Sequence, residues 1–178
     1  MKARITTLAL VAFGALTLTG LAIAGGPLVS FGDADVTVSK NASAHIVVGS
    51  GESGGVYRNQ TPTKLLKKVK LSFISTGDVG GGAPRWSIPV STDNDATTTE
   101  GYAFLDAAGC GATVGDNPTS IPTLVSTKVA TCKVNFLGVD YANWKALVAA
   151  FPTARTAKAV SFVIADVPGD YFVTRVTS

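Results

Sequence analysis

The sequence predicts a mainly all-β protein: an antiparallel, jelly-roll-like β-sandwich with one short amphipathic helix near residues 140–151. Three observations predict this fold. Short stretches in which apolar and polar residues alternate recur along the chain. Gly, Pro, Asn and Asp separate these stretches, and only one stretch has the spacing of a helix. Many short strands with one peripheral helix are typical of two sheets closed around a single core.

The first 24 residues predict a secretory signal peptide. Lys2 and Arg4 precede an apolar run that extends to about Leu21, and Ala22-Ile23-Ala24 supplies the small residues of a cleavage site. A membrane anchor is the alternative, but the small residues and the Gly-Gly-Pro that follows argue against it. We therefore expect a single β-sandwich domain over residues 25–178, secreted to the extracellular space or the cell surface. No second long apolar run follows, so no membrane span is expected in the mature chain.

The net charge excludes one class of partner. The chain has 15 Lys and Arg against 12 Asp and Glu, and two of the basic residues lie in the leader. The mature part thus has 13 basic and 12 acidic residues, a net charge of +1. Nucleic-acid binding is not expected, because it requires a concentrated basic face.

The first half of the domain predicts short strands separated by a glycine-rich loop. Residues 35–38 and 44–48 are rich in β-forming residues, and the glycine-dense residues 49–55 predict a loop. Residues 69–75 alternate cleanly, with every second residue apolar.

Residues 85–91 predict a further strand. Trp86, Ile88 and Val90 lie on one face of it, and Arg85, Ser87 and Pro89 on the other. Because proline cannot donate to a sheet, this strand is predicted to lie at an edge or to bulge at Pro89.

The second half predicts four more strands and the helix. The strands cover residues 101–106, 128–136, 160–164 and 171–177. In the stretch DYANWKALVAAFP the apolar residues share one helical face, Asp140 is placed to cap the helix and Pro152 to end it. The Trp and Tyr of this helix predict packing against the core rather than a binding platform.

The two cysteines, Cys110 and Cys132, predict a disulfide, because an exported chain leaves the reducing cytosol. Closing a loop of this size restricts the unfolded chain by about 3 kcal/mol. A catalytic thiol and a zinc site are the alternatives. Neither has support, since His45 is the only histidine.

The motif GESGG at residues 51–55 resembles the surroundings of a catalytic serine. Ser53 would need a histidine as base and a carboxylate to orient that histidine. His45 lies eight residues upstream in a predicted strand, which is not the context of a known serine hydrolase. Catalysis at Ser53 is therefore not expected.

An acidic loop follows the strand at residues 85–91. Asp93, Asp95 and Glu100 could bind calcium, but the EF-hand pattern fails and Asp and Asn also favour simple turns. We predict no cofactor, with calcium as the alternative. Arg85, Asp93 and Asp95 are the candidate binding residues. The lysine-rich stretch 64–70 predicts a solvated surface, and Asn41 and Asn59 begin glycosylation sequons.

The segments GGGAPRWSIPV…DND, GYAFLDAAGC and DYANWKALVAAFP…VSFVIADVPGDYFVTRV occur in this order over roughly residues 69–178. In this respect the chain resembles a loose group of uncharacterised bacterial secreted proteins that share a GGGxPR-aromatic-S strand. The resemblance implies a secreted β-sandwich and no established activity.

These observations together predict a secreted, non-catalytic β-sandwich protein that acts as an extracellular interaction or surface-binding module. Its partner would be an extracellular glycan, a cell-surface polymer or a protein. A carbohydrate-binding module is the first alternative, which exposed coplanar rings would favour and burial of Trp86 and Trp144 would disfavour. A small secreted hydrolase is the second, and it requires Ser53 beside His45 or a pair of carboxylates in a cleft.

Overall fold

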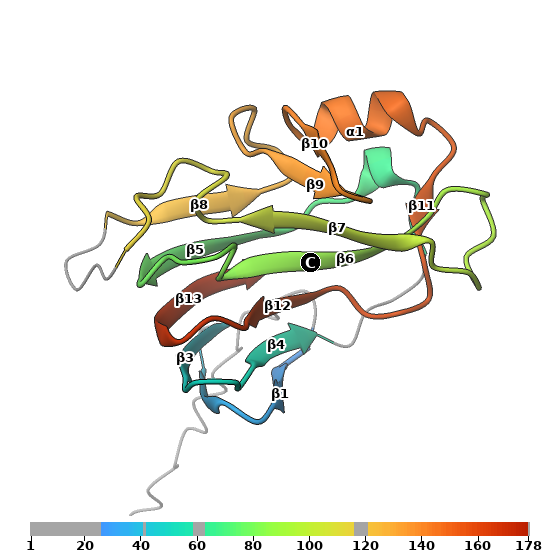
Figure 1. Cartoon of the computed structure of the whole chain (residues 1–178). Coiled ribbons are helices and arrows are strands. Elements are labelled where there is room, and N and C mark those ends of the chain that lie inside the picture. Colours follow the sequence, from blue (N-terminus) through green and yellow to red (C-terminus); the bar gives the residue numbers. More distant parts are fainter. Residues whose placement is uncertain (1–25, 41, 59–62, 116–120, 178) are drawn as a thin grey trace, which may run out of the picture.

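Two antiparallel sheets pack face to face in the computed structural model, which describes residues 26–40, 42–58, 63–115 and 121–177 (Figure 1). The predicted signal peptide and the sequons at Asn41 and Asn59 lie outside the described residues. Within the described part of the chain, no helix is long and apolar enough to cross a membrane.

The larger sheet has eight strands. Its order is β1 (Leu28–Gly32), β4 (Gly54–Arg58), β12 (Phe162–Ala165), β6 (Arg85–Ser91), β7 (Gly101–Asp106), β9 (Val134–Phe136) and β10 (Val139–Tyr141), and β11 (Arg155–Thr156) also pairs with β6. The smaller sheet has the order β2 (Asp35–Ser39), β3 (Ser43–Val48), β13 (Gly169–Thr177), β5 (Ser72–Gly77) and β8 (Thr123–Ser126).

The strand order is that of a jelly roll. Eight strands form two facing sets of four, β3-β13-β5-β8 and β4-β12-β6-β7, and the first and last of the eight pair with each other. The chain crosses between the sheets at most of its connections, and only β6 and β7 follow one another within one set. The predicted all-β, jelly-roll-like sandwich is therefore confirmed.

One apolar core fills the space between the sheets. Strict alternation turns Trp86, Ile88 and Val90 of β6 inward, and all three are almost fully buried. The ring of Phe73 on β5 lies 6.0 Å from that of Trp86 and joins the two layers. Burial of each large side chain contributes about 1.5–3 kcal/mol, so this layer carries much of the folding free energy.

The predicted edge position of β6 is wrong, because the strand lies in the interior of the sheet with β7 on one side. On its other side β12 pairs with residues 85–87 and β11 with residues 90–91, so the partner strand changes at Pro89. The carbonyl of Pro89 accepts from the N–H of Ala157 on that side. The missing N–H of Pro89 therefore faces a gap between two partner strands, where no ladder bond is lost.

The helix is shorter than predicted. Helix α1 spans Trp144–Ala150, and Asn143, not Asp140, caps it by accepting a hydrogen bond from the N–H of Ala146 at 3.0 Å. Asp140 lies in β10, where its carboxylate accepts from Asn135. A short β-hairpin thus takes the place of the predicted first turn.

Five strands were not predicted: β1, β4, β8, β10 and β11. Strands β1, β4 and β8 lie where the sequence showed no clear alternation, and β4 begins inside the glycine-dense segment predicted to be a loop. One predicted strand was too long. Of residues 128–136 only Val134–Phe136 is strand, because the preceding residues form turns and leave Ala130 exposed.

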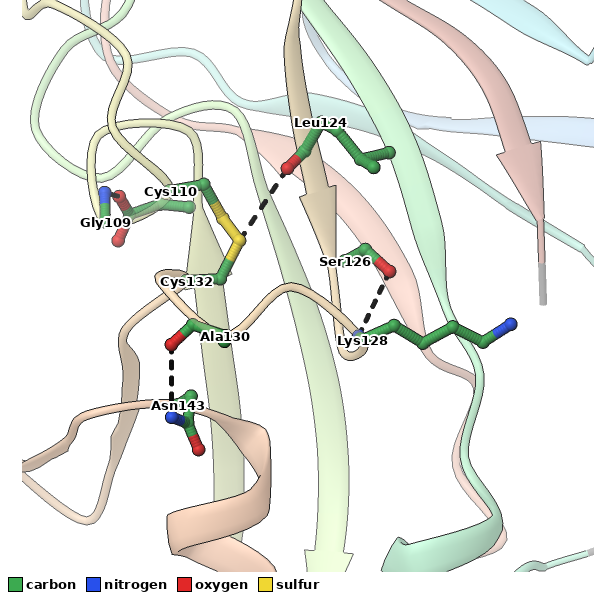
Figure 2. Close-up of a disulfide and its surroundings, with 9 residues drawn as sticks. Gly109, Cys110, Leu124, Ser126, Lys128, Ala130, Cys132 and Asn143 are labelled. Carbon is green, nitrogen blue, oxygen red and sulfur yellow. Dashed lines mark hydrogen bonds between the residues drawn. A yellow bond between two sulfur atoms is a disulfide. The ribbon is translucent and has the colours of Figure 1, made fainter.

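The predicted disulfide is present between Cys110 and Cys132. It joins the turn after β7 to the turn before β9, as Figure 2 shows, and the sulfur of Cys132 is fully buried beside the carbonyl of Leu124. The same region is held to the helix, because the Asn143 side chain donates to the carbonyl of Ala130 at 3.1 Å. Turns that contribute few ladder hydrogen bonds are thus anchored covalently.

Candidate aromatic binding face

The structure separates the three binding residues that the sequence suggested. Arg85 begins β6, whereas Asp93 and Asp95 lie in the loop after its other end. A strand of this length places the two groups about 20 Å apart. They do not form one site.

The acidic loop is organised by its own hydrogen bonds. Asp93 accepts from the N–H of Asp95 and from the Ser91 hydroxyl, both at 2.8 Å, and these bonds lower the pKa of Asp93. The N–H and hydroxyl of Thr97 lower the pKa of Asp95 in the same way. Glu100 accepts from the N–H of Thr92 at 2.6 Å. Among the described residues there is no group of three side chains that could hold a metal ion.

Arg85 has three contacts on the outer face of the larger sheet, the face turned away from the smaller sheet, and one of them is a hydrogen bond to the carbonyl of Gly82 at 3.4 Å. Its guanidinium forms a bidentate pair with Asp166, at 2.6 Å and 2.5 Å, and lies 5.2 Å from the centre of the Phe104 ring. Hydrogen bonding to Arg85 holds the pKa of Asp166 below its ordinary value, despite partial burial. The side chain is therefore fixed between a carboxylate and a ring.

Strand β6 leaves space on this outer face for neighbouring rings. Its outward residues after Arg85 are Ser87 and Pro89, which are both short. Phe162 on β12 and Phe104 on β7 flank Ser87 in the register. Rings from the two neighbouring strands therefore meet above β6 and cover Ser87, which is only 2% exposed.

Five aromatic side chains form a continuous row on this face. We call Phe31, Tyr57, Tyr102, Phe104 and Phe162 the aromatic face. Successive ring centres lie 6.2 Å apart for Tyr57 and Phe31, 5.3 Å for Phe31 and Phe162, 5.9 Å for Phe162 and Tyr102, and 6.5 Å for Tyr102 and Phe104. The row crosses the sheet from β1 and β4 to β7, strands that Figure 1 shows in that order, and Arg85 ends it.

The rings of the aromatic face pack on the sheet and are partly exposed to solvent. Phe31 lies against Gly55 of β4, where a β-carbon would come within 2.8 Å of the ring. Tyr102 is 36% exposed, and the other four rings are partly exposed. The hydroxyls of Tyr57 and Tyr102 have no hydrogen-bond partner among the described residues. The surface is thus apolar, held in place, and bears two polar groups that are free to bind.

Both tryptophans lie elsewhere. Trp86 is 1% exposed in the core and Trp144 is 5% exposed, with its indole N–H donating to the carbonyl of Leu66 at 3.0 Å. Burial of both tryptophans is the outcome that disfavours the carbohydrate-binding alternative, and it leaves no tryptophan-based sugar site among the described residues. The rings that do reach the surface are Tyr and Phe, and Tyr102 and Phe104 have nearly parallel planes, 15° apart.

The sequence analysis did not select the aromatic face. A signal was present in β7, where Tyr102 and Phe104 alternate with Ala103 and Leu105, so that both faces of the strand are apolar. The same holds in β12, where Phe162 and Ile164 point outward and Val163 and Ala165 fill the core. A strand that is apolar on both faces needs cover or contact on its outer side.

The remaining candidate residues have structural surroundings. His45 on β3 contacts the carboxylate of Asp170 at 2.6 Å and stacks on Phe172, with ring centres 4.2 Å apart. Ser53 lies in the turn before β4, and its N–H donates to Asp33. The four lysines of residues 64–70 are exposed around a 3-10 turn, η1 (Leu66–Lys68), whose Leu66 is buried.

Comparison of the chain with protein-family models, curated proteins and solved structures gave no match. The resemblance to bacterial secreted proteins with a GGGxPR-aromatic-S strand therefore stays a prediction. The case for a function rests on the geometry of the aromatic face.

Proposed function

We propose that the protein is a secreted, non-catalytic binding module that attaches to an extracellular surface through its aromatic face. The observation that carries the proposal is the unbroken row of five rings across the outer side of the larger sheet. An apolar surface of this kind on the outside of a sandwich is typical of a contact site.

The order of the rings supports a binding role over a purely structural one. The core is complete without them, since the inward residues of β6, β7 and β12 are fully buried. The rings instead cover the outside of the sheet, with Arg85 fixed at one end by Asp166. A preformed surface loses little conformational entropy on binding, which favours affinity.

Co-sedimentation tests the proposal. Purified protein is mixed with intact cells of the source organism and, separately, with insoluble extracellular polysaccharides. We expect the wild-type chain to sediment with at least one of these, and Tyr102→Ala and Phe162→Ala to weaken binding by roughly tenfold each.

Phe172→Ala is the matched control. Phe172 is 41% exposed on the outer face of the smaller sheet, so its loss removes a ring of the same size from the opposite side of the molecule. This variant should sediment like the wild type. Equal binding by all four proteins, or no binding by any, would refute the proposal.

A further inference from the structure

We infer that the ligand of the aromatic face is an uncharged glycan chain, an inference that rests on the proposed function. Three properties of the face lead to this class of ligand: its length, its charge and the chemistry of its exposed groups.

The aromatic face is an extended band across the sheet. From β1 to β7 there are four steps between neighbouring strands, which is about 19 Å at the usual spacing. Tyr57, Phe162 and Phe104 share one register row across the sheet, and Phe31 and Tyr102 lie two residues to either side of it, so the rings form a band that is linked pair by pair through ring contacts. A surface of this shape matches several units of a linear polymer better than one small molecule.

The charges around the row disfavour an anionic polymer. In the described strand rows that hold the rings, Arg85 is the only cation, and its guanidinium is paired with Asp166; Lys133 lies directly beyond, next to Asp106. Asp106 lies opposite Arg85 on β7, and Asp140 lies beyond Phe104 across Asn135. Three carboxylates against two cations, of which Arg85 is already engaged, leave a negative charge that disfavours phosphate-rich or carboxylate-rich chains, whereas an uncharged chain is not repelled.

The exposed groups match the two sides of a sugar. The apolar C–H side of a sugar ring packs on the electron-rich face of an aromatic ring. Hydroxyl groups at the edge of the sugar need hydrogen-bond partners, and the hydroxyls of Tyr57 and Tyr102 are free among the described residues. Of the five N–H groups of the Arg85 guanidinium, Asp166 engages two and the carbonyl of Gly82 a third. The aromatic face thus offers both aromatic stacking and hydrogen bonding to one ligand.

A matched pair of matrices tests the inference. We expect the wild-type chain to bind at least one of cellulose, chitin, β-1,3-glucan and starch in 150 mM salt. We expect binding to the carboxymethyl form of the same matrix to be at least roughly tenfold weaker. Tyr102→Phe removes only the hydroxyl and should weaken binding less than Tyr102→Ala, while Phe172→Ala should bind normally.

Treated cells separate this inference from the proposed function. Cellulase, chitinase, β-1,3-glucanase and amylase each digest one of the four candidate glycans, whereas proteinase removes surface proteins. If cell binding depends on the rings but survives all four glycosidases and is lost after proteinase, the ligand is a protein: the binding role stands and the glycan inference is overturned. If light scattering shows a dimer that Tyr102→Ala separates into monomers, a second copy covers the face, and both proposals fail.

Discussion

Arg85 lies at the end of the aromatic face, between Phe104 and Asp166. Its bidentate pair with Asp166 is only partly buried, so water screens the interaction and its contribution to stability is about 1 kcal/mol. Its greater effect is positional, because the pair holds the guanidinium against Phe104. The end of the ring row is thereby fixed before any ligand arrives.

Replacing Asp166→Asn should lower stability in a pH-dependent way. The pKa of Asp166 is lower in the folded protein than the value near 3.9 of an unfolded chain. Its ion pair therefore stabilises the fold above about pH 4, and this stabilisation disappears as the pH falls through the lowered pKa. In urea titrations the wild type should exceed the variant by about 1 kcal/mol at pH 7 and by much less at pH 2–3.

Arg85→Gln provides the control from the other side of the pair. It should give a similar loss at pH 7, and the double variant should lose little more than either single variant. A difference between wild type and Asp166→Asn that is equally large at both pH values would show that the carboxylate does not act through its charge.

At the level of residues, the alternating pattern of a strand predicted which way a side chain points but not which residue it contacts. That Arg85 points away from Trp86 followed from the period of two in a strand. Its partner Asp166 is 81 residues away and could not be predicted, since the register between β6 and β12 is set by packing of the whole sheet. Asp93 and Asp95 serve the loop itself, as the turn interpretation of this segment predicted.

Strand β4 shows how one missing side chain allows two strands to pair. A β-carbon at Gly55 would lie 2.1 Å from the carbonyl oxygen of Val163 in β12 and 2.8 Å from the ring of Phe31. The strands β4 and β12 can therefore take this close register only with glycine here. The aromatic face depends on the same contact, because Phe31 rests on this residue.

We expect Gly55→Ala to destabilise the protein by about 3 kcal/mol, since the clash is with backbone and cannot be relieved by a side-chain rotation. Gly80→Ala is the control, because its added carbon would meet only Val167 at 3.6 Å, an ordinary contact. That variant should stay within about 0.5 kcal/mol of the wild type. Chemical unfolding monitored by tryptophan fluorescence measures both, and equal losses would contradict the role given to Gly55.

Elements with a regular pattern were predicted well, and elements set by tertiary contacts were not. Residues 85–91 and 101–106 are strands with the predicted bounds, because their alternation continues from end to end. Strand β4 was not predicted because its glycines do not favour a strand. They adopt strand conformation because β1 and β12 pair with β4 on its two sides. The helix lost its predicted first turn because Asp140 and Tyr141 pair with β9 instead.

The disulfide acts on the stability of the whole molecule. Replacing both cysteines, Cys110→Ala with Cys132→Ala, releases a constraint across 22 residues and should cost about 3 kcal/mol. Heating with and without dithiothreitol measures the effect. Reductant should lower the melting temperature of the wild type to that of the double variant and leave the double variant unchanged. A reductant effect on the double variant would mean that other chemistry is involved.

The class of fold followed from the sequence, whereas the strand order did not. Short alternating strands and a single helix were enough to predict a sandwich. Which strands become neighbours is decided by contacts between distant segments, such as β3 with β13 and β4 with β12. The aromatic face belongs to this second category, since its five rings come from four strands that the chain enters at widely separated points.

Strand β13 occupies the middle of the smaller sheet, between β3 and β5. Until Gly169–Thr177 has been made, β3 and β5 lack the neighbour that joins them, so the sheet stays divided into two strand pairs, β2 with β3 and β5 with β8, which are marginally stable alone. The smaller sheet therefore closes late, through contacts between distant segments that form slowly. A chain whose smaller sheet closes late stays unfolded for longer while it is made, which would suit passage through a translocation channel in the secretion that we propose.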